Sequence, residues 1–583
     1  MERKKIYICV YILVVTIFLH SCSLMEPLDD NHSTIDRVYD DPSFAEGLLI
    51  RAYTLIPTND YRFDDVATDD AVSNDRANDY LRMASGEWSP SFDPQSLWTD
   101  CNRAILYINQ FLSIVDDVPW KWTNPEIAAL YIRKFKGESY ALRGLFKYYL
   151  LRNHGGPAGS GQLLGAPIYN EFITSTEEFA TPRADFQLFV ESAVADMEEA
   201  LKYLPADYGN VGAVPPGFDG TDVDAYNEVF GDFAQQRMSG RHTKALEARL
   251  ALLVASEAFN PNHNTSLWEN AANQFAELLT DIGGVNGIDP NGHLFYLKQQ
   301  VDQADITTGD KRDLQEILWR RPIANNRTRE EDNFPPSLYG KGRINPTQNL
   351  VDAFPMANGY PINDPNAHYD ETDPYKNRDP RLPAYIVYNG SQLKNKTINT
   401  SLSGGEDGID EQQTSTRTGY YLKKLLREDV NADPASPSSQ KHFNTHIRYT
   451  ELFLSFAEAA NEAWGPDGSR AGFSAREIIA AIRKRAGIEQ PDAYLASITN
   501  PEAMRTLIRN ERRLELCFEG FRFWDLRRWK VDLTEVAKGV RIEENTYHFF
   551  TVEPRSYNND YMHYGPVPQS EVVKFGFEQN KGW

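Results

Sequence analysis

The chain is poor in cysteine. Its 583 residues include four cysteines, of which Cys9 and Cys22 lie near the N-terminus. The other two, Cys101 and Cys517, lie in apolar helical patterns, and two thiols do not make a disulfide framework. The fold must therefore be stabilised by a hydrophobic core, which a chain of this length can bury.

The sequence also lacks the short motifs of common active sites. It contains neither a GxSxG nucleophile elbow nor an HExxH zinc motif. His442 and His446 are four residues apart without the intervening Glu, and we interpret them as the start of a helix. Asp222-Val223-Asp224 resembles part of a calcium loop, but the Gly and Glu of that loop are not at the required spacing. The sequence thus predicts neither a metal site nor a cofactor.

Positive charge is scarce. The chain has 83 acidic and 60 basic residues and a net charge of −23. An acidic protein of this size repels phosphate backbones, so nucleic acid is excluded as the expected partner. Aromatic residues are plentiful at 12%, which suits stacking on sugar rings, although we expect most of them to serve packing.

Long apolar runs are absent after residue 19. The run Ile6–Leu19 follows three basic residues, and as a helix of about 21 Å it is too short for a ~30 Å hydrocarbon core. This arrangement predicts a signal peptide over residues 1–21. The following Leu19-His20-Ser21-Cys22 resembles a bacterial lipobox, in which Cys22 is acylated and anchors the chain. The alternative is ordinary secretion with a free Cys22.

Helical periodicity occurs in two blocks, residues 98–280 and 446–530. The predicted helices are Trp98–Val115, Pro125–Asn153, Asp185–Leu204, His242–Phe259, Leu267–Leu279, His446–Trp464, Ser474–Ala486 and Pro501–Glu519. In two pairs of consecutive helices, small alanine side chains on one helix precede larger apolar side chains on the next. Such pairs are typical of tetratricopeptide-like hairpins, so we predict a mainly α fold built on a helical hairpin scaffold.

Two stretches lack this periodicity. Residues 281–445 are rich in Asn, Asp, Gly and Pro, with only short strand-like runs such as Tyr385–Tyr388 and Gly419–Leu422. Residues 57–96 have the same polar character. Long loop regions on a rigid scaffold are usually functional, so we expect them to carry a binding face.

Three carboxylates raise the possibility of catalysis. Glu511, Glu515 and Glu519 are spaced by four residues, which places neighbouring carboxylates ~6 Å apart on one helix face. That separation is within reach of a glycosidase pair. Four arginines nearby are expected to keep them ionised, whereas a general acid needs a raised pKa. These arginines are Arg509, Arg512, Arg513 and Arg522. We favour a structural ion-pair network; the alternatives are a glycan hydrolase and a purely structural scaffold.

The segment Glu519–Trp529, EGFRFWDLRRW, resembles the EGxRxxDLxRW signature of the SusD/RagB family. Further segments resemble family motifs in the family's order along nearly the whole chain. They are Gly137–Arg143, Gly155–Pro157, Asn377–Arg381, Arg448–Glu462, Ile482–Gly487, Arg509–Glu515 and Pro566–Trp583.

This resemblance implies one SusD-like domain over residues 22–583. The domain would consist of the helical scaffold 98–280 and 446–530, a loop-rich ligand-side insertion 281–445 and a C-terminal segment 531–583. The family fold has four tetratricopeptide-like hairpins. Its members are non-catalytic nutrient-binding lipoproteins on the surface of a Bacteroidetes-type outer membrane. They pass oligosaccharides, or in the RagB branch peptides, to a SusC-like TonB-dependent β-barrel transporter.

By position in the family, the ligand-facing loops would be Asp69–Tyr80 and Ala324–Arg343. The candidate ligand-binding residues are Asp70, Asn74, Arg76, Asn78, Tyr80, Asn326, Arg327 and Tyr339. Which glycan binds, or whether the ligand is a peptide, is left open by the sequence.

Overall fold

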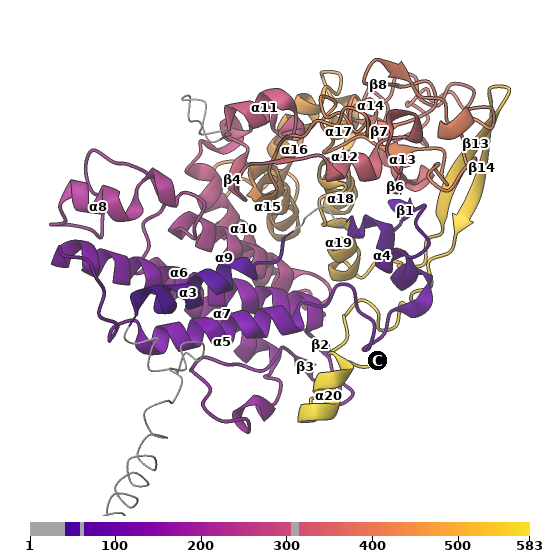
Figure 1. Cartoon of the computed structure of the whole chain (residues 1–583). Helices are drawn as coiled ribbons and strands as arrows, with labels where there is room; N and C mark the ends of the chain where they lie inside the picture. The colour runs from indigo at the N-terminus through magenta and orange to yellow at the C-terminus, as the bar shows by residue number, and fades with distance from the viewer. Residues whose placement is uncertain (1–40, 59–62, 305–313) are drawn as a thin grey trace, which may run out of the picture.

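Long helices occupy one half of the molecule and short strands and loops the other (Figure 1). The structure is a computed structural model that describes residues 41–58, 63–304 and 314–583. The predicted signal peptide and Cys22 lie outside these residues. Among the described helices, none is long and apolar enough to cross a membrane.

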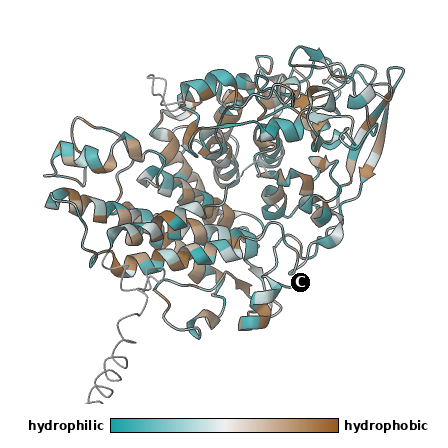
Figure 2. Ribbon diagram, viewed as in Figure 1, coloured by the Kyte–Doolittle hydropathy of each residue, from teal (hydrophilic) through white to brown (hydrophobic). Residues whose placement is uncertain are grey.

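The first helical block contains the longest helices of the described chain. Its helices are α3 (Pro42–Thr54), α5 (Trp98–Ile114), α6 (Pro125–His154), α7 (Phe186–Leu201), α8 (Val223–Phe230), α9 (Gly240–Ala255) and α10 (Thr265–Thr280). Neighbours in this series pack on one another, as α5 does on α6 and α9 on α10. Buried alanines of α9 face Trp268 and Phe275 of α10 within one hydrophobic core. The predicted pairing of small with large side chains is therefore present, and the helices show hydrophobic and hydrophilic faces in Figure 2.

The second helical block continues this core. Its helices are α15 (Tyr449–Trp464), α16 (Ala475–Ala486), α17 (Ala493–Ser497), α18 (Pro501–Leu516) and α19 (Arg522–Arg528). Helix α15 packs on α10, α16 and α18, which joins the two blocks. The interpretation of His442 and His446 as the start of a helix is wrong. His442 lies in strand β11 (Gln440–His442) and His446 in strand β12 (Thr445–Arg448), and both strands pair with the insertion.

The insertion 281–445 forms most of a second hydrophobic core, built around fully buried rings such as Phe334, Tyr385, Tyr420 and Tyr421. Its helices are α11 (Lys298–Gln303), α12 (Thr328–Asn333), α13 (Gln348–Ala353) and α14 (Arg381–Tyr385). Its strands before residue 440 are β4 (Ile317–Arg320), β5 (Ala324–Asn326), β6 (Ile344–Pro346), β7 (Ile386–Val387), β8 (Gln392–Leu393), β9 (Lys396–Thr397) and β10 (Tyr421–Leu422). The two strand-like runs found in the sequence pair with each other, β10 antiparallel to β7. The loops of this region are thus fixed by a packed interior.

The segments near the two ends of the chain complete the fold. The N-terminal segment carries β1 (Ala71–Ser73) and α4 (Asp79–Arg82). The C-terminal segment forms an antiparallel hairpin of β13 (Ala537–Glu543) and β14 (Thr546–Glu553), followed by α20 (Gln569–Phe575). Directly after helix α6, β2 (Gly156–Pro157) pairs with β3 (Leu163–Leu164). Trp88, from the N-terminal segment, packs its ring against Phe523, Tyr557 and Trp583.

Candidate ligand-binding site

The two loops predicted to face the ligand are joined by a short sheet. Strand β1 pairs antiparallel with β6, with Ala71 opposite Pro346 and Ser73 opposite Ile344. Directly after β1, the buried side chain of Asn74 donates hydrogen bonds to the carbonyl oxygens of Lys341 and Gly342, at 2.9 and 2.8 Å. Residues 267 and 268 positions apart in sequence are therefore held on one wall.

This wall borders a cavity of about 910 Å³. The volume lies within the range of about 300–1,000 Å³ that is common for ligand pockets. The described lining side chains are mostly polar or charged: Phe63, Ser73, Asp75, Asn78, Arg321, Pro322, Ala324, Asn326, Thr328, Arg329, Asp332, Asn333, Lys341, Arg343, Ile344, His442, Phe443 and Asn444. Both predicted loops contribute to it, and residues 442–444 form a third part that the sequence analysis missed.

Residues 442–444 reach the cavity through strand pairing. Strand β11 runs antiparallel to β5, with Gln440 opposite Asn326 and His442 opposite Ala324. Beyond it, Asn444 accepts a 2.8 Å hydrogen bond from Arg329 through its side-chain oxygen. No local pattern in the sequence links residues more than 100 positions apart, so only the folded chain reveals this contribution.

Two of the eight candidate residues line this cavity. Asn78 is the N-cap of α4, where its side-chain oxygen accepts from the Leu81 amide at 3.0 Å. Asn326 is exposed at the end of β5, and its side-chain oxygen accepts from the Thr328 amide at 2.6 Å. The amide nitrogen of each side chain has no hydrogen bond within the described residues, so both groups are able to donate to a ligand.

Asp70 and Asn74 are buried behind the cavity wall. The Asp70 carboxylate, fully buried, accepts a 2.7 Å hydrogen bond from Arg513. Burial raises the pKa of Asp70, whereas Arg513 and Arg522 hold the pKa of neighbouring Asp69 well below its usual range despite burial. These residues support the wall from inside, and neither Asp70 nor Asn74 is among the side chains that line the cavity.

The other four candidates lie outside the lining of this cavity. Arg76 is exposed on the turn between β1 and α4, and Arg327 is ion-paired with Glu331 at 2.6 Å. Tyr339 ends a short 3₁₀ helix with a left-handed φ of 66° and is 58% exposed. Tyr80 is half-buried and lines a different cavity, of about 210 Å³, beside Tyr148 and Trp524. Tyr339 is thus the exposed aromatic residue among the candidates, two residues before Lys341 of the wall.

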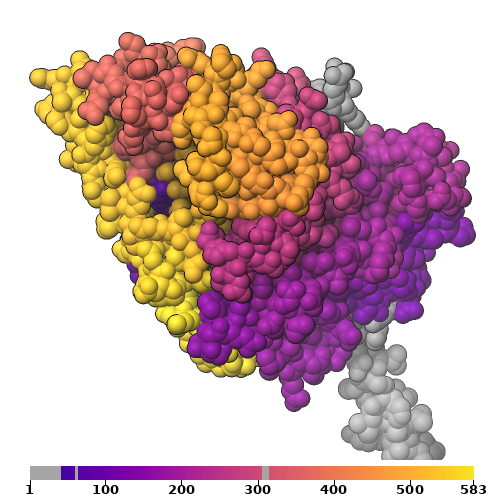
Figure 3. All heavy atoms as spheres, turned by 180° about the vertical axis from the view of Figure 1, so that it is seen from behind, coloured from indigo at the N-terminus to yellow at the C-terminus, as the bar shows by residue number. Residues whose placement is uncertain are grey.

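A further cavity, of about 460 Å³, opens on the side opposite the view of Figure 1. Figure 3 shows a hollow there between the C-terminal segment and residues near 350–400 and 480–520, with atoms of the N-terminal segment at its base. Its lining includes Asp69, Asp352, Arg513 and Arg522. Both acidic and basic side chains line this cavity. Asp69 already accepts hydrogen bonds from Arg513 and Arg522.

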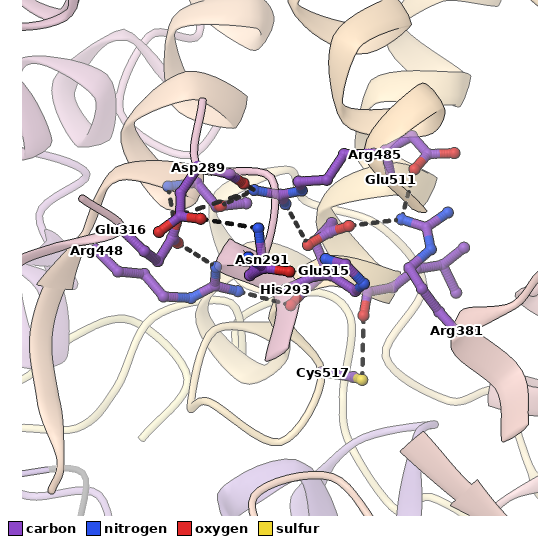
Figure 4. A network of polar contacts seen from close by, with 12 residues as sticks. Asp289, Asn291, His293, Glu316, Arg381, Arg448, Arg485, Glu511, Glu515 and Cys517 are labelled. Atoms are coloured by element: carbon purple, nitrogen blue, oxygen red, sulfur yellow. Dashed lines mark hydrogen bonds and ion pairs between the residues drawn. The ribbon is translucent and has the colours of Figure 1, made fainter. Parts of the chain in front are cut away.

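The three glutamates of the α18 region lie in a buried ion-pair network, drawn in part in Figure 4. Glu515 accepts from Arg381 at 2.9 Å and from Arg485 at 2.8 Å. Glu511 accepts from Arg381 at 2.9 Å and from Arg483 at 2.7 Å. The arginines come from the insertion and from α16, so the network fastens the insertion to the helical scaffold.

The partners of these glutamates differ from those predicted. Arg512 instead binds Asp525 at 2.7 Å, and Arg513 and Arg522 bind the Asp69 region. The ion-pair interpretation is nevertheless supported by the electrostatics. Although burial opposes it, Arg485 and Arg381 hold the pKa of Glu515 far below its usual range. A carboxylate so strongly stabilised in its ionised form cannot serve as a general acid near neutral pH.

The described part of the chain contains no group of three or more His, Cys, Asp or Glu residues arranged to hold a metal ion. Asp222, interpreted in the sequence as part of an incomplete calcium loop, is the N-cap of α8.

Comparison with known proteins supports the resemblance. The model of the SusD family matches residues 315–583. A SusD-like protein, P38, of Formosa agariphila is 22% identical over 544 residues, which cover 90% of this chain and 91% of the relative. The chain is thus similar to SusD-like proteins over most of its length, and its C-terminal part matches the family model. The resemblance stated from the sequence is thereby confirmed.

Solved structures share the fold of this SusD-like protein. A SusD-like protein from Bacteroides fragilis superposes with a TM-score of 0.70 at 23% identity, covering 96% of this chain and all of the other. A SusD-like carbohydrate-binding protein from the same organism superposes with a TM-score of 0.66 at 19% identity, covering 92% and 98%. At such low identity these likenesses show the fold alone. The predicted mainly α, SusD-like fold is confirmed.

The SusD/RagB signature of this chain has a structural role. Within Glu519–Trp529, Glu519 binds Arg448 and Lys424, and Arg528 binds Glu458 through two hydrogen bonds of 2.6 Å. Trp529 donates its ring N–H to Glu458 at 2.7 Å. These contacts join the signature to strand β12, to the insertion and to helix α15.

Proposed function

We propose that this SusD-like protein is a non-catalytic, cell-surface binding protein that captures an oligosaccharide in the 910 Å³ cavity and delivers it to a SusC-like TonB-dependent transporter. The observation that carries the proposal is the convergence of the two predicted ligand loops and residues 442–444 on one cavity. A carbohydrate-binding structural relative gives independent support for a glycan ligand.

The chemistry of the cavity suits a sugar. Amide and hydroxyl side chains such as Asn78, Asn326 and Thr328 line it and are able to exchange hydrogen bonds with ligand hydroxyls. Phe63 and Phe443 also border the cavity, with most of their rings buried in the hydrophobic core. The exposed Tyr339 ring beside the wall offers a stacking surface for a sugar ring. A peptide ligand is the alternative that the test below distinguishes.

Absence of catalysis is proposed from the state of the glutamates. Glu511, Glu515 and Glu519 are each bound by two cationic side chains, and the pKa of Glu515 and of Glu519 is lowered despite burial. None of the three lines the 910 Å³ cavity. Bound ligand would therefore not meet an acid and base pair there.

The membrane and transporter parts of the proposal rest on the sequence and the family. A lipobox-like Leu19-His20-Ser21-Cys22 follows the apolar run, and acylation of Cys22 would anchor the protein on the outer membrane. A SusC-like barrel is the partner that the family implies. Isolation of the protein from its native membrane in mild detergent should recover a large β-barrel transporter with it. Repeated recovery of the protein without any transporter would contradict the partnership.

Ligand binding is tested with purified protein on arrays of glycans and peptides, followed by calorimetry. We expect glycan binding that Asn326→Ala weakens about tenfold, a change equal to 1.4 kcal/mol. Asn78→Ser preserves the helix cap but shortens the side chain and should also reduce affinity. Asn270→Ala, on the exposed face of α10, is the matched control. Exclusive binding of peptides, or release of glycan cleavage products, would refute this function.

A further inference from the structure

Basic side chains outnumber acidic ones in the lining of the 910 Å³ cavity, although the chain as a whole is acidic. Four basic and two acidic residues are among its lining: Arg321, Arg329, Lys341, Arg343, Asp75 and Asp332. The whole chain, by contrast, has 83 acidic and 60 basic residues. A cleft lined mainly by one sign of charge concentrates ligands of the opposite sign.

The backbone fixes the positions of Lys341 and Arg343 on this wall. Their amides donate to the carbonyl oxygens of Glu331 and Asp332, both at 2.9 Å. Gly342 between them has a φ of +53°, and an added Cβ would lie 2.5 Å from the Thr414 carbonyl oxygen. Together with the Asn74 hydrogen bonds, these constraints place both cationic side chains before any ligand arrives, which lowers the ordering cost of binding.

The present partners of these two cations are weakly held. The Arg343 guanidinium lies 3.6 Å from the Asp75 carboxylate, beyond the distance of a strong hydrogen bond. Lys341 contacts Asp332 at 2.8 Å, but the two side chains are 52% and 38% exposed. Exposed ion pairs of this kind contribute little to stability, so an anionic ligand group can replace them at small cost.

We infer that the cavity takes an acidic oligosaccharide, whose carboxylate or sulfate group binds between Arg343 and Lys341. The inference rests on the proposed function and specifies its substrate class. The planar guanidinium of Arg343 offers two parallel N–H donors to such a group, and Lys341 adds a point charge. Asn78 and Asn326 on the same cavity are left to bind the neutral hydroxyls of the sugar.

The experiment uses an array that holds neutral, uronic-acid-containing and sulfated oligosaccharides, followed by calorimetry with the strongest binder. Arg343→Gln and Lys341→Gln should each weaken that binder about 10- to 100-fold, as expected for loss of a charge-assisted hydrogen bond. Wild-type affinity should fall as sodium chloride is raised, because the ion pair is screened. Arg541→Gln is the control, since this arginine is also in an exposed ion pair, on the β13–β14 hairpin away from the cavity lining. All three variants should unfold at the wild-type temperature.

Each outcome has one meaning. Selection of acidic glycans with loss of affinity in Arg343→Gln, and none in Arg541→Gln, supports the inference, and the array shows whether the carboxylate or the sulfate source is preferred. Selection of neutral glycans with unchanged affinity in Arg343→Gln overturns the inference and leaves the proposed function intact. Acidic glycans that bind equally well to Arg343→Gln also overturn it. Absence of glycan binding overturns both.

Discussion

Replacing Glu515 by Gln tests whether buried ion pairs hold the insertion on the scaffold. The Glu515 side chain is fully buried and accepts one hydrogen bond from Arg381 and one from Arg485. Glutamine keeps the shape but removes the charge, and its NH₂ group faces a guanidinium donor. One of the two arginines therefore loses its partner in a site that water does not reach.

The expected loss of unfolding free energy depends on the contacts that Arg381 and Arg485 keep in the variant. Breaking a buried ion pair by removing one partner costs about 3–5 kcal/mol, because the other charge stays buried. Arg381 retains Asp379 and Glu511, and Arg485 retains Thr450 at 2.9 Å. Because these contacts still satisfy both arginines in part, we expect a loss of unfolding free energy near the lower end of this range, about 3 kcal/mol.

The free energy of unfolding is measured by urea titration, followed by circular dichroism. Glu277→Gln is the control, because Glu277 pairs with Lys244 on the surface, where its side chain is 61% exposed, and its loss should cost about 0–1 kcal/mol. Equal losses in the two variants would refute the argument that the network stabilises the fold. Hydrolysis of a glycan by the wild type that Glu515→Gln abolishes would instead show that this carboxylate is catalytic.

Four further predictions concern stability, binding and anchoring. Burial raises the pKa of Glu458 but Arg528 lowers it more, to about 2. The ionised Glu458 therefore stabilises the fold fully above about pH 4.5, and this contribution is lost as pH falls toward 2. Glu458→Gln should flatten this part of the pH dependence of stability, measured by thermal unfolding. Asn74→Leu leaves the Lys341 carbonyl without its donor and should cost about 1–3 kcal/mol in unfolding free energy, together with weaker ligand binding in calorimetry. Tyr339→Ala should weaken glycan binding about tenfold without changing the unfolding temperature, because the ring is exposed; unchanged affinity would exclude it from the site. Fatty-acid labelling should mark the wild type and not Cys22→Ala, and equal labelling of both would contradict the lipid anchor.

The position of the ligand face illustrates how far the sequence reaches. The family resemblance singled out residues 69–80 and 324–343 within two polar stretches, and both ranges border the 910 Å³ cavity. Within each range, however, the sequence could not tell inward from outward side chains. Asp70 and Asn74 face the interior, where Arg513 and backbone carbonyls bind them, whereas Asn78 and Asn326 border the cavity.

For the glutamates of the α18 region, the sequence likewise predicted ion pairs but not the residues that form them. Their four-residue spacing and the arginines nearby indicated a structural network, and they are indeed ion-paired. The true partners, Arg381 and Arg485, are distant in sequence, whereas the neighbouring Arg512 turns toward Asp525. Spacing along a helix defines a face, but the element packed on that face supplies the opposite charges.

The sequence by itself determined the helical scaffold and the resemblance to the SusD/RagB family, because a 3.6-residue period and a contiguous signature are local properties of the chain. Tertiary structure alone decided how β1 meets β6, how β11 adds residues 442–444 to the cavity, and which cation binds which carboxylate. The two strand pairings join residues more than 100 positions apart. Their geometry depends on packing of the whole insertion core, which no local pattern of residues encodes.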